Sequence, residues 1–364
     1  MMLALLIALT LGIVLLPMIP ALREWSRPTD VVPLHIDDDD ALDPPYLARR
    51  FMQELTQAVG AGAGELGGSK IACVEATQAE LPLSDFERAK RRSPRLWHAA
   101  GAAELPEGVS FQGEVVAHGA LKSAARGAYR ALWSGARLSL LAGCRVQRWA
   151  HGLEVLVGKD CRIPGRVSAD HSIVVEHGVQ FGLLHAPEIR FADLPGTPMR
   201  AFNTRVVGVA HTGLSNPMQW DVNELRAVCT HSAQVEPLHS WRGDLVCHGD
   251  LSVGSQCHAR GSLKAHGSLE LGPGCHVTGS VFAQGEIRLG AGCVVHGHVV
   301  SETAVLLAPG CVVGWMSQPA TVAAPHIDVG PAVRVHGTLW AATMGRSWFA
   351  FEHNRLPALA QVAA

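Results

Sequence analysis

The chain has 364 residues, nine cysteines and a formal net charge of −2, from 30 basic and 32 acidic residues. This balance argues against the broad positive field of a nucleic-acid-binding protein, so we expect no nucleic-acid partner. Only 5% of the residues are aromatic and 38 are glycine, which favours repetitive β-structure over a helical bundle. An odd number of cysteines with no C-x-x-C pair fits neither a zinc ribbon nor a complete disulfide framework.

The N-terminal segment is long and apolar. Residues 1–22 read MMLALLIALTLGIVLLPMIPAL and contain no charged side chain. As a helix they would measure about 33 Å, enough to cross the core of a bilayer. A cleaved signal peptide would need a basic start and a small-x-small cleavage site, and neither is present. A buried helix of a soluble core is the other alternative. We therefore predict a transmembrane anchor over residues 1–22.

The charges after this segment predict its orientation. Arginines follow it at positions 23, 27, 49 and 50, whereas only the α-amino group precedes it. The positive-inside rule then places the rest of the chain in the cytoplasm, so the segment is predicted to anchor the chain to the inner (cytoplasmic) membrane with a single pass. Cysteines without an evident pairing agree with a reducing compartment.

Residues 23–106 are predicted to form a tether with one short amphipathic helix, at about residues 45–59. The stretch DPPYLARRFMQELTQAVG begins with proline and repeats apolar residues near the helical period. A basic cluster between Arg88 and Arg95 could contact anionic lipid, although such a cluster is more often simply solvated.

The most informative part of the sequence is an exact 18-residue repeat. From Gly243 the blocks are GDLVCHGDLSVGSQCHAR, GSLKAHGSLELGPGCHVT, GSVFAQGEIRLGAGCVVH and GHVVSETAVLLAPGCVVG. Positions 3, 5, 9, 11, 15 and 17 are apolar or small in every block. A spacing of two within each pair fits one face of a β-strand, and a spacing of six between pairs gives three short strands per block. The sequence therefore predicts an all-β fold, a three-sided single-stranded β-solenoid (β-helix) of 18-residue turns.

Two sets of residues carry this prediction. The structural core ladder is expected to include Cys257, Cys275, Cys293, Cys311, Leu263, Leu269, Leu271, Val277, Ile287 and Leu289. The turn glycines, which recur at position one, are Gly243, Gly261, Gly279 and Gly297. Glycine suits a corner because it allows positive φ and close approach of neighbouring backbones.

The same frame recurs outside these blocks. We predict an irregular first array at residues 107–191, an insertion or loop at 192–237, a regular second array at 238–341 and a C-terminal tail or cap at 342–364. Counting partial turns gives about nine turns in all. The simplest interpretation of the interruption is a long loop that leaves one continuous solenoid, and two stacked or separate solenoids are the alternative.

The cysteine and histidine columns suggest chemistry but have simpler explanations. Valine replaces cysteine at positions 179 and 333, which indicates that the thiol serves as a small core residue. His248 and His266, and likewise His258 and His276, should stack on outward positions. Such pairs can bind metal, but glutamine, glutamate or valine follows in the next turns, which favours a solvated polar face. We expect no catalytic, cofactor or metal site, and no enzyme.

The blocks at residues 243–314 resemble the repeat of bactofilins, which are polymer-forming cytoskeletal proteins of bacteria. Weaker similarity covers 108–186 and 323–341. The resemblance implies a right-handed β-helix, nucleotide-independent head-to-tail self-assembly into filaments or a homo-oligomer, and a scaffold for proteins of the cell envelope or cell shape. These would be its partners, together with the membrane.

Two other functions remain open at this stage. Hexapeptide-repeat acyltransferases also have three six-residue sides per turn, but their repeat pattern is only partly met here. A periplasmic polysaccharide-binding β-helix would need the opposite topology and an outward row of carboxylates or aromatic side chains.

Overall fold

The computed structural model describes residues 43–75, 81–192, 219–221 and 226–348, together with the single residues Met2, Met18, Ile19 and Arg23. The chain divides into two compact units, Met1–Asp43 and Pro44–Ala364. In the described residues no helix is both long and apolar enough to cross a membrane. The predicted anchor at 1–22 lies outside the described residues, apart from three single positions.

The first array begins earlier than the sequence predicts. Its two helices are α4 (Tyr46–Gly60), over the predicted helical stretch, and α5 (Asp85–Lys90). Its strands are β1 (Glu65–Leu66), β2 (Ser69–Val74), β3 (Arg92–Ser93), β4 (Leu96–Ala99), β5 (Ala103–Glu104), β6 (Ser110–Ala117), β7 (Leu121–Lys122), β8 (Ala128–Ser134), β9 (Arg137–Leu140), β10 (Arg145–Val157), β11 (Arg162–Val175) and β12 (Gln180–Phe191). Solenoid strands thus occupy part of the predicted tether.

The second array is more regular and its strands are shorter. They are β13 (Gln219–Asp221), β14 (Arg226–Cys229), β15 (Ala233–Val235), β16 (Ser240–Arg242), β17 (Asp244–Cys247), β18 (Leu251–Val253), β19 (His258–Arg260), β20 (Leu263–Ala265), β21 (Leu269–Leu271), β22 (His276–Val277), β23 (Val281–Ala283), β24 (Ile287–Leu289), β25 (Val294–Val295), β26 (Val299–Ser301), β27 (Ala304–Leu307), β28 (Val312–Val313), β29 (Ala320–Val329) and β30 (Arg334–Ser347).

Within each array every turn pairs in parallel with the next, so the predicted β-solenoid is the fold. Side one carries β14, β17, β20, β23 and β26, side two β15, β18, β21, β24 and β27, and side three β16, β19, β22, β25 and β28. Leu263 pairs with Val281, exactly one repeat later. Turns of the first array vary in length: Val155 pairs with Ile173, one full repeat later, whereas Ile173 pairs with Ile189 across a shorter turn.

The interior is a continuous stack of inward side chains. All ten residues predicted for the core ladder are buried, none more than 1% exposed. The inward columns of the two arrays belong to one hydrophobic cluster. Each inward residue lies on its equivalent in the neighbouring turn, which keeps the core free of water.

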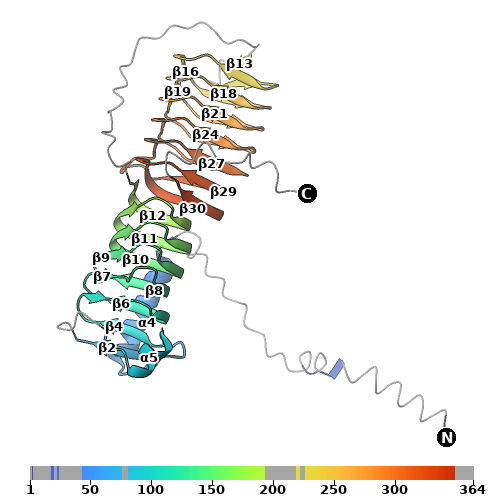
Figure 1. The fold of residues 1–364 in the computed structure, drawn as a ribbon. Helices are drawn as coiled ribbons and strands as arrows, with labels where there is room; N and C mark the ends of the chain where they lie inside the picture. Colours follow the sequence, from blue (N-terminus) through green and yellow to red (C-terminus); the bar gives the residue numbers. More distant parts are fainter. Residues whose placement is uncertain are drawn as a thin grey trace. The chain divides into compact units, whose positions relative to one another are not determined.

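The two arrays meet through their last turns, in opposite directions. Strand β12 pairs antiparallel with β30 on all three sides, with Leu184 opposite Leu339, Phe181 opposite Gly345 and Ile189 opposite Val335 (Figure 1). Each array therefore starts at a free end and finishes at the shared junction. This differs from a loop leaving one continuous solenoid, in which the strands would stay parallel.

The solenoid has about 12 turns, more than the predicted nine, because turns at the array starts lack the repeat signature. Ile71 pairs with Leu96, well over one repeat later, since α5 is inserted in that turn. The turn that starts with β14 keeps the repeat spacing, with Leu245 pairing to Ala227, but position one is leucine at 225 rather than glycine. The last turn also extends to Ser347, past the predicted end at 341.

Position one shows why the repeat needs glycine. A Cβ on Gly261 would lie 2.3 Å from the carbonyl oxygen of Gly243, and a Cβ on Gly279 would lie 2.5 Å from that of Gly261. These distances are far inside van der Waals contact with backbone that cannot rotate away. Glycine is thus required by the turn beneath it, and a first turn, with nothing beneath, is free of the requirement.

We expect Gly279→Ala to lower the free energy of unfolding by about 2 kcal/mol or more, because the added methyl must push two turns apart. Gly64→Ala is the matched control: no atom lies within 4 Å of its Cβ position, so its stability should change by less than about 0.5 kcal/mol. Urea unfolding followed by circular dichroism measures both. Equal stability of the two variants would contradict the steric explanation.

Candidate self-assembly and partner-binding surfaces

The cysteine column is held by hydrogen bonds as well as by packing. Cys275 Sγ donates to the carbonyl oxygen of Gly254 at 3.0 Å, and Cys293 Sγ to that of Gly272 at 3.2 Å. Those carbonyls lie at the corner between sides two and three of the preceding turn. The contact with Cys275, together with burial, raises the pKa of the Cys257 thiol. The thiol therefore stays protonated near neutral pH and remains a donor.

The same bond recurs through the molecule, in the first array with a slightly shorter spacing. The other pairs are Cys257 with the Glu236 carbonyl, Cys311 with Gly290, Cys144 with Ala124 and Cys161 with Leu141, at 3.0 to 3.2 Å. The cysteine thiols thus donate hydrogen bonds to backbone carbonyls, which valine cannot do. The sequence alone did not indicate this role.

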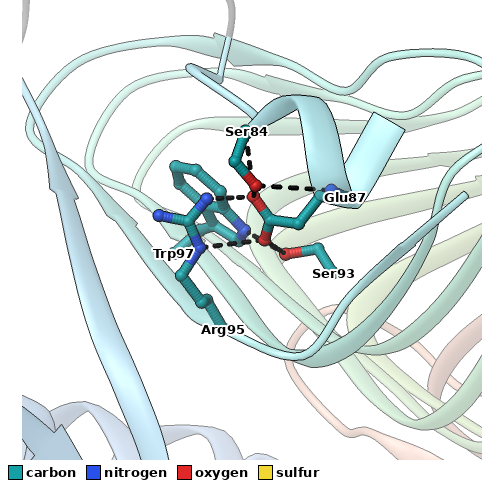
Figure 2. A network of polar contacts seen from close by, with 5 residues as sticks. All are labelled: Ser84, Glu87, Ser93, Arg95 and Trp97. Atoms are coloured by element: carbon teal, nitrogen blue, oxygen red, sulfur yellow. Dashed lines mark hydrogen bonds and ion pairs between the residues drawn. The ribbon is translucent and has the colours of Figure 1, made fainter. Parts of the chain in front are cut away.

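The free end of the first array is closed by a polar network around Glu87 (Figure 2). Glu87 is 3% exposed and forms a capping box with Ser84 at the start of α5. Its carboxylate accepts hydrogen bonds from the Ser93 hydroxyl at 2.7 Å and from Arg95 Nε at 2.9 Å, and a second Arg95 nitrogen forms an ion pair with it. Trp97 Nε1 donates to Ser93 Oγ at 2.8 Å, which ties the network to the core.

Apolar residues complete this closure. Leu81 and Leu83, just before α5, are buried in the main core cluster with Leu105 and Val109. On side one, β2 pairs with β4, and β1 covers the edge of β2 in antiparallel pairing. The sequence prediction of a tether missed this closed end. The S-x-x-E pattern of Ser84 and Glu87 was the one available signal.

The free end of the second array is more open. In the described residues β15 pairs only with β18 and β16 only with β19, whereas β14 is also covered by β13. Trp241 occupies the inward column and is only half-buried, and its indole Nε1 is buried with no hydrogen-bond partner among the described residues. Leu238, three residues earlier in the chain, is 72% exposed. Free strand edges next to apolar side chains favour pairing with another chain.

Helix α4 covers outward apolar residues on side one of the first array. Ala48 packs with Ala131 and Trp149, and Leu55 packs with Leu96. The Phe51 and Trp149 rings lie 5.4 Å apart. We call this contact the α4 seam. It shows that the outer face of side one accepts an amphipathic helix.

In the part of the chain that the structure describes, no helix covers an apolar stripe on the same side of later turns. It consists of register neighbours in successive strands, from β23 through β12: Phe282, Val300, Ala323, Trp340 and Leu183. Trp340 is 55% exposed and Phe282 38%. The other three residues are half-buried, and contiguous, partly exposed apolar residues of this kind mark interaction surfaces. The stripe also crosses the junction between the arrays.

The two histidines of each pair lie next to each other in successive turns, as the sequence predicts, but their rings are tilted or edge-on rather than stacked. The ring centroids of His248 and His266 are 5.1 Å apart, and those of His258 and His276 are 5.5 Å apart. His276 also contacts His296, which sequence reasoning did not single out. No group of three or more His, Cys, Asp or Glu residues is arranged to hold a metal ion in the described part of the chain.

A shallow polar groove lies on side two across β15, β18, β21 and β24. Its carboxylates are Asp250, Glu270 and Glu286. Asp250 Oδ1 accepts the Ser268 backbone N–H at 2.7 Å, and Glu286 pairs with Arg288 at 3.0 Å. These two groups connect neighbouring residues of the chain itself, so the groove does not present the free carboxylate row expected of a polysaccharide site.

No protein-family model matches the chain, and no match was found among curated proteins or solved structures.

We expect Cys293→Val to lower the free energy of unfolding by about 1 kcal/mol, because the Gly272 carbonyl loses its donor. Val333 occupies the position equivalent to the cysteines in another turn and is fully buried, so a valine side chain fits in this column. Cys73→Val, at an exposed cysteine, controls for loss of a thiol as such and should be nearly neutral. Chemical denaturation measures both variants. If Cys293→Val is as stable as the parent, the thiol acts only as a packing group.

The capped end should depend on pH through Glu87. Hydrogen bonding from Arg95 is the main cause that lowers its pKa from 4.5 to about 2. Because the folded pKa is depressed, this contribution is complete above about pH 4.5 and is lost as the pH falls towards 2. Glu87→Gln should cost about 2 kcal/mol at pH 7 and weaken the dependence of unfolding on pH between 5 and 3.

Glu104→Gln is the control for this experiment, since Glu104 forms only an exposed ion pair with Lys122 at 3.4 Å. Such pairs contribute little, so its stability at pH 7 should be close to that of the parent. An equal loss in the two variants would show that the Glu87 network does not stabilise the end.

Proposed function

We propose that the chain is a non-enzymatic, bactofilin-like structural scaffold of the bacterial inner membrane. In this proposal residues 1–22 anchor it, and the solenoid lies in the cytoplasm. It associates with further copies of itself through the open end of the second array, without a nucleotide, and binds envelope or cell-shape proteins along its side. The stacked β-solenoid is consistent with such a scaffold.

The observation that carries the proposal is the internal junction. There β12 and β30 join two solenoid turns end on end, with antiparallel pairing on all three sides. Turns of this repeat can therefore stack on an array that did not precede them in the chain. The β14–β16 turn offers a comparable surface on sides two and three, where β15 and β16 have free edges in the described residues.

The difference between the two ends limits the assembly. The Glu87 network, Leu81 and Leu83 close the first end, so we expect association mainly through the second. This produces paired solenoids more readily than long filaments. Among the described residues the stripe from Phe282 to Leu183 is not covered by a helix, and we assign it to a partner protein with an amphipathic helix, by analogy with the α4 seam.

Electron microscopy and mass photometry of the full chain in detergent test self-association. We expect end-to-end pairs that form without nucleotide and that dissociate on dilution. Leu238→Lys should weaken pairing at least tenfold without loss of stability, because Leu238 is 72% exposed and a charge would be buried at the contact.

A proline variant tests the strand edge itself. Ala233 N–H bonds to Asp250, and Val235 C=O to Gly254, so the N–H of the intervening Gln234 points away from β18. Gln234→Pro should therefore abolish pairing while retaining the fold, whereas Gln234→Thr should pair normally. Single solenoids at every concentration in the parent, or unaffected pairing in Gln234→Pro, would contradict the proposal.

A further inference from the structure

Two histidines from successive turns meet edge to face on the outside of the second array. His276, in β22, and His296, just after β25, have their Nε2 atoms 2.8 Å apart. Their ring centroids are 4.6 Å apart with planes at 78°. The Trp315 ring makes an edge contact with that of His296, with centroids 5.0 Å apart and planes at 86°.

The same arrangement occurs independently in the first array. His98, in β4, and His118, just after β6, also have their Nε2 atoms 2.8 Å apart, with ring planes at 82°. Trp133 packs edge-on against His118 with centroids 5.7 Å apart. In both pairs the first histidine lies in a strand, and the second lies at the corner just after the strand that pairs with it in the next turn.

The distance between the nitrogens suits a metal ion. Two bonds of about 2.0 Å that meet at a right angle place their nitrogens about 2.8 Å apart, which is the cis arrangement of a tetragonal Cu²⁺ or Ni²⁺ centre. With no ion, a proton shared between the two Nε2 atoms explains the short contact equally well. For both Nε2 atoms to bind one metal ion, the ring that carries its proton on Nε2 moves that proton to its own Nδ1, and both rings rotate slightly, so no net proton is lost.

We propose that the chain binds two divalent transition-metal ions, Cu²⁺ or Ni²⁺. One ion is coordinated by His276 and His296 and the other by His98 and His118, so each ion links two successive turns. The remaining coordination positions face solvent, since His276, His296 and His98 are half-buried and His118 is exposed. This agrees with the absence of any three-ligand group in the described residues.

The environment of the rings favours the neutral, ligating form. Burial, followed by the neighbouring His296 and His258, lowers the pKa of His276. Burial and then His118 lower the pKa of His98. Neutral imidazole is the form that binds metal, so neither pair needs to lose a proton to bulk solvent before it binds at neutral pH.

The chain contains its own negative control. His248 and His266 also come from successive turns, but their ring planes are tilted by only 30°, with centroids 5.1 Å apart. No hydrogen bond joins them among the described residues, so their nitrogens are not directed at a common point. If any two adjacent histidines sufficed, this pair would bind metal as well.

The test is titration of the metal-free full chain, in detergent, with Cu²⁺ or Ni²⁺ alone. Isothermal calorimetry should give two ions per chain, and Cu²⁺ electron paramagnetic resonance should show coupling to two nitrogens at each. His276→Gln and His98→Gln should each reduce the stoichiometry to one and the double variant to none, whereas His248→Gln should retain two. Saturating Ni²⁺ should also raise the melting temperature of the parent but not of the double variant.

Circular dichroism of the metal-free variants checks that each still folds. Unchanged stoichiometry in the folded double variant, loss of an ion in His248→Gln, or absence of saturable binding in the parent would each overturn the proposal.

Discussion

The structure depends on the backbone hydrogen bonds between successive turns. They stack each residue on its equivalent in the next turn, at a separation of about 4.8 Å. Side chains must therefore suit a column of like residues rather than a single pocket. This explains glycine above glycine at Gly261 and Gly279, where a Cβ would strike the backbone beneath. It also explains why each thiol of the cysteine column reaches the corner carbonyl of the preceding turn, as Cys275 reaches Gly254.

The column constraint also determines what the sequence could predict. Between residues 243 and 314 every column is occupied and nothing is inserted, so the strands, the core and the outward histidine pairs followed from spacing. The sequence did not predict the turn that contains β14, because a first turn needs no glycine at position one. The turn between Ile71 and Leu96 was also not predicted, because the inserted α5 makes it longer than the 18-residue repeat. The antiparallel junction could not be predicted, because inward periodicity is the same whichever way two arrays are stacked.

The surfaces were less predictable than the core, since outward positions are not tied to the repeat. The α4 seam requires Trp149 and Ala131 to share a face with residues of a helix far earlier in the chain, such as Ala48. The contact of His276 with His296 joins a strand residue to a corner residue of the next turn. Neither follows from the period of the repeat. The Glu87 network, by contrast, had a local signal in its capping box.

The antiparallel junction constrains how copies can associate. Because the arrays wind towards each other, both free ends are first turns, and the strand direction at one end is opposite to that at the other. A copy stacked on either end must then meet it with antiparallel strands, as β12 meets β30. In the proposed self-association, the contact between copies would therefore have the antiparallel pairing of the internal junction rather than continue the solenoid with parallel strands.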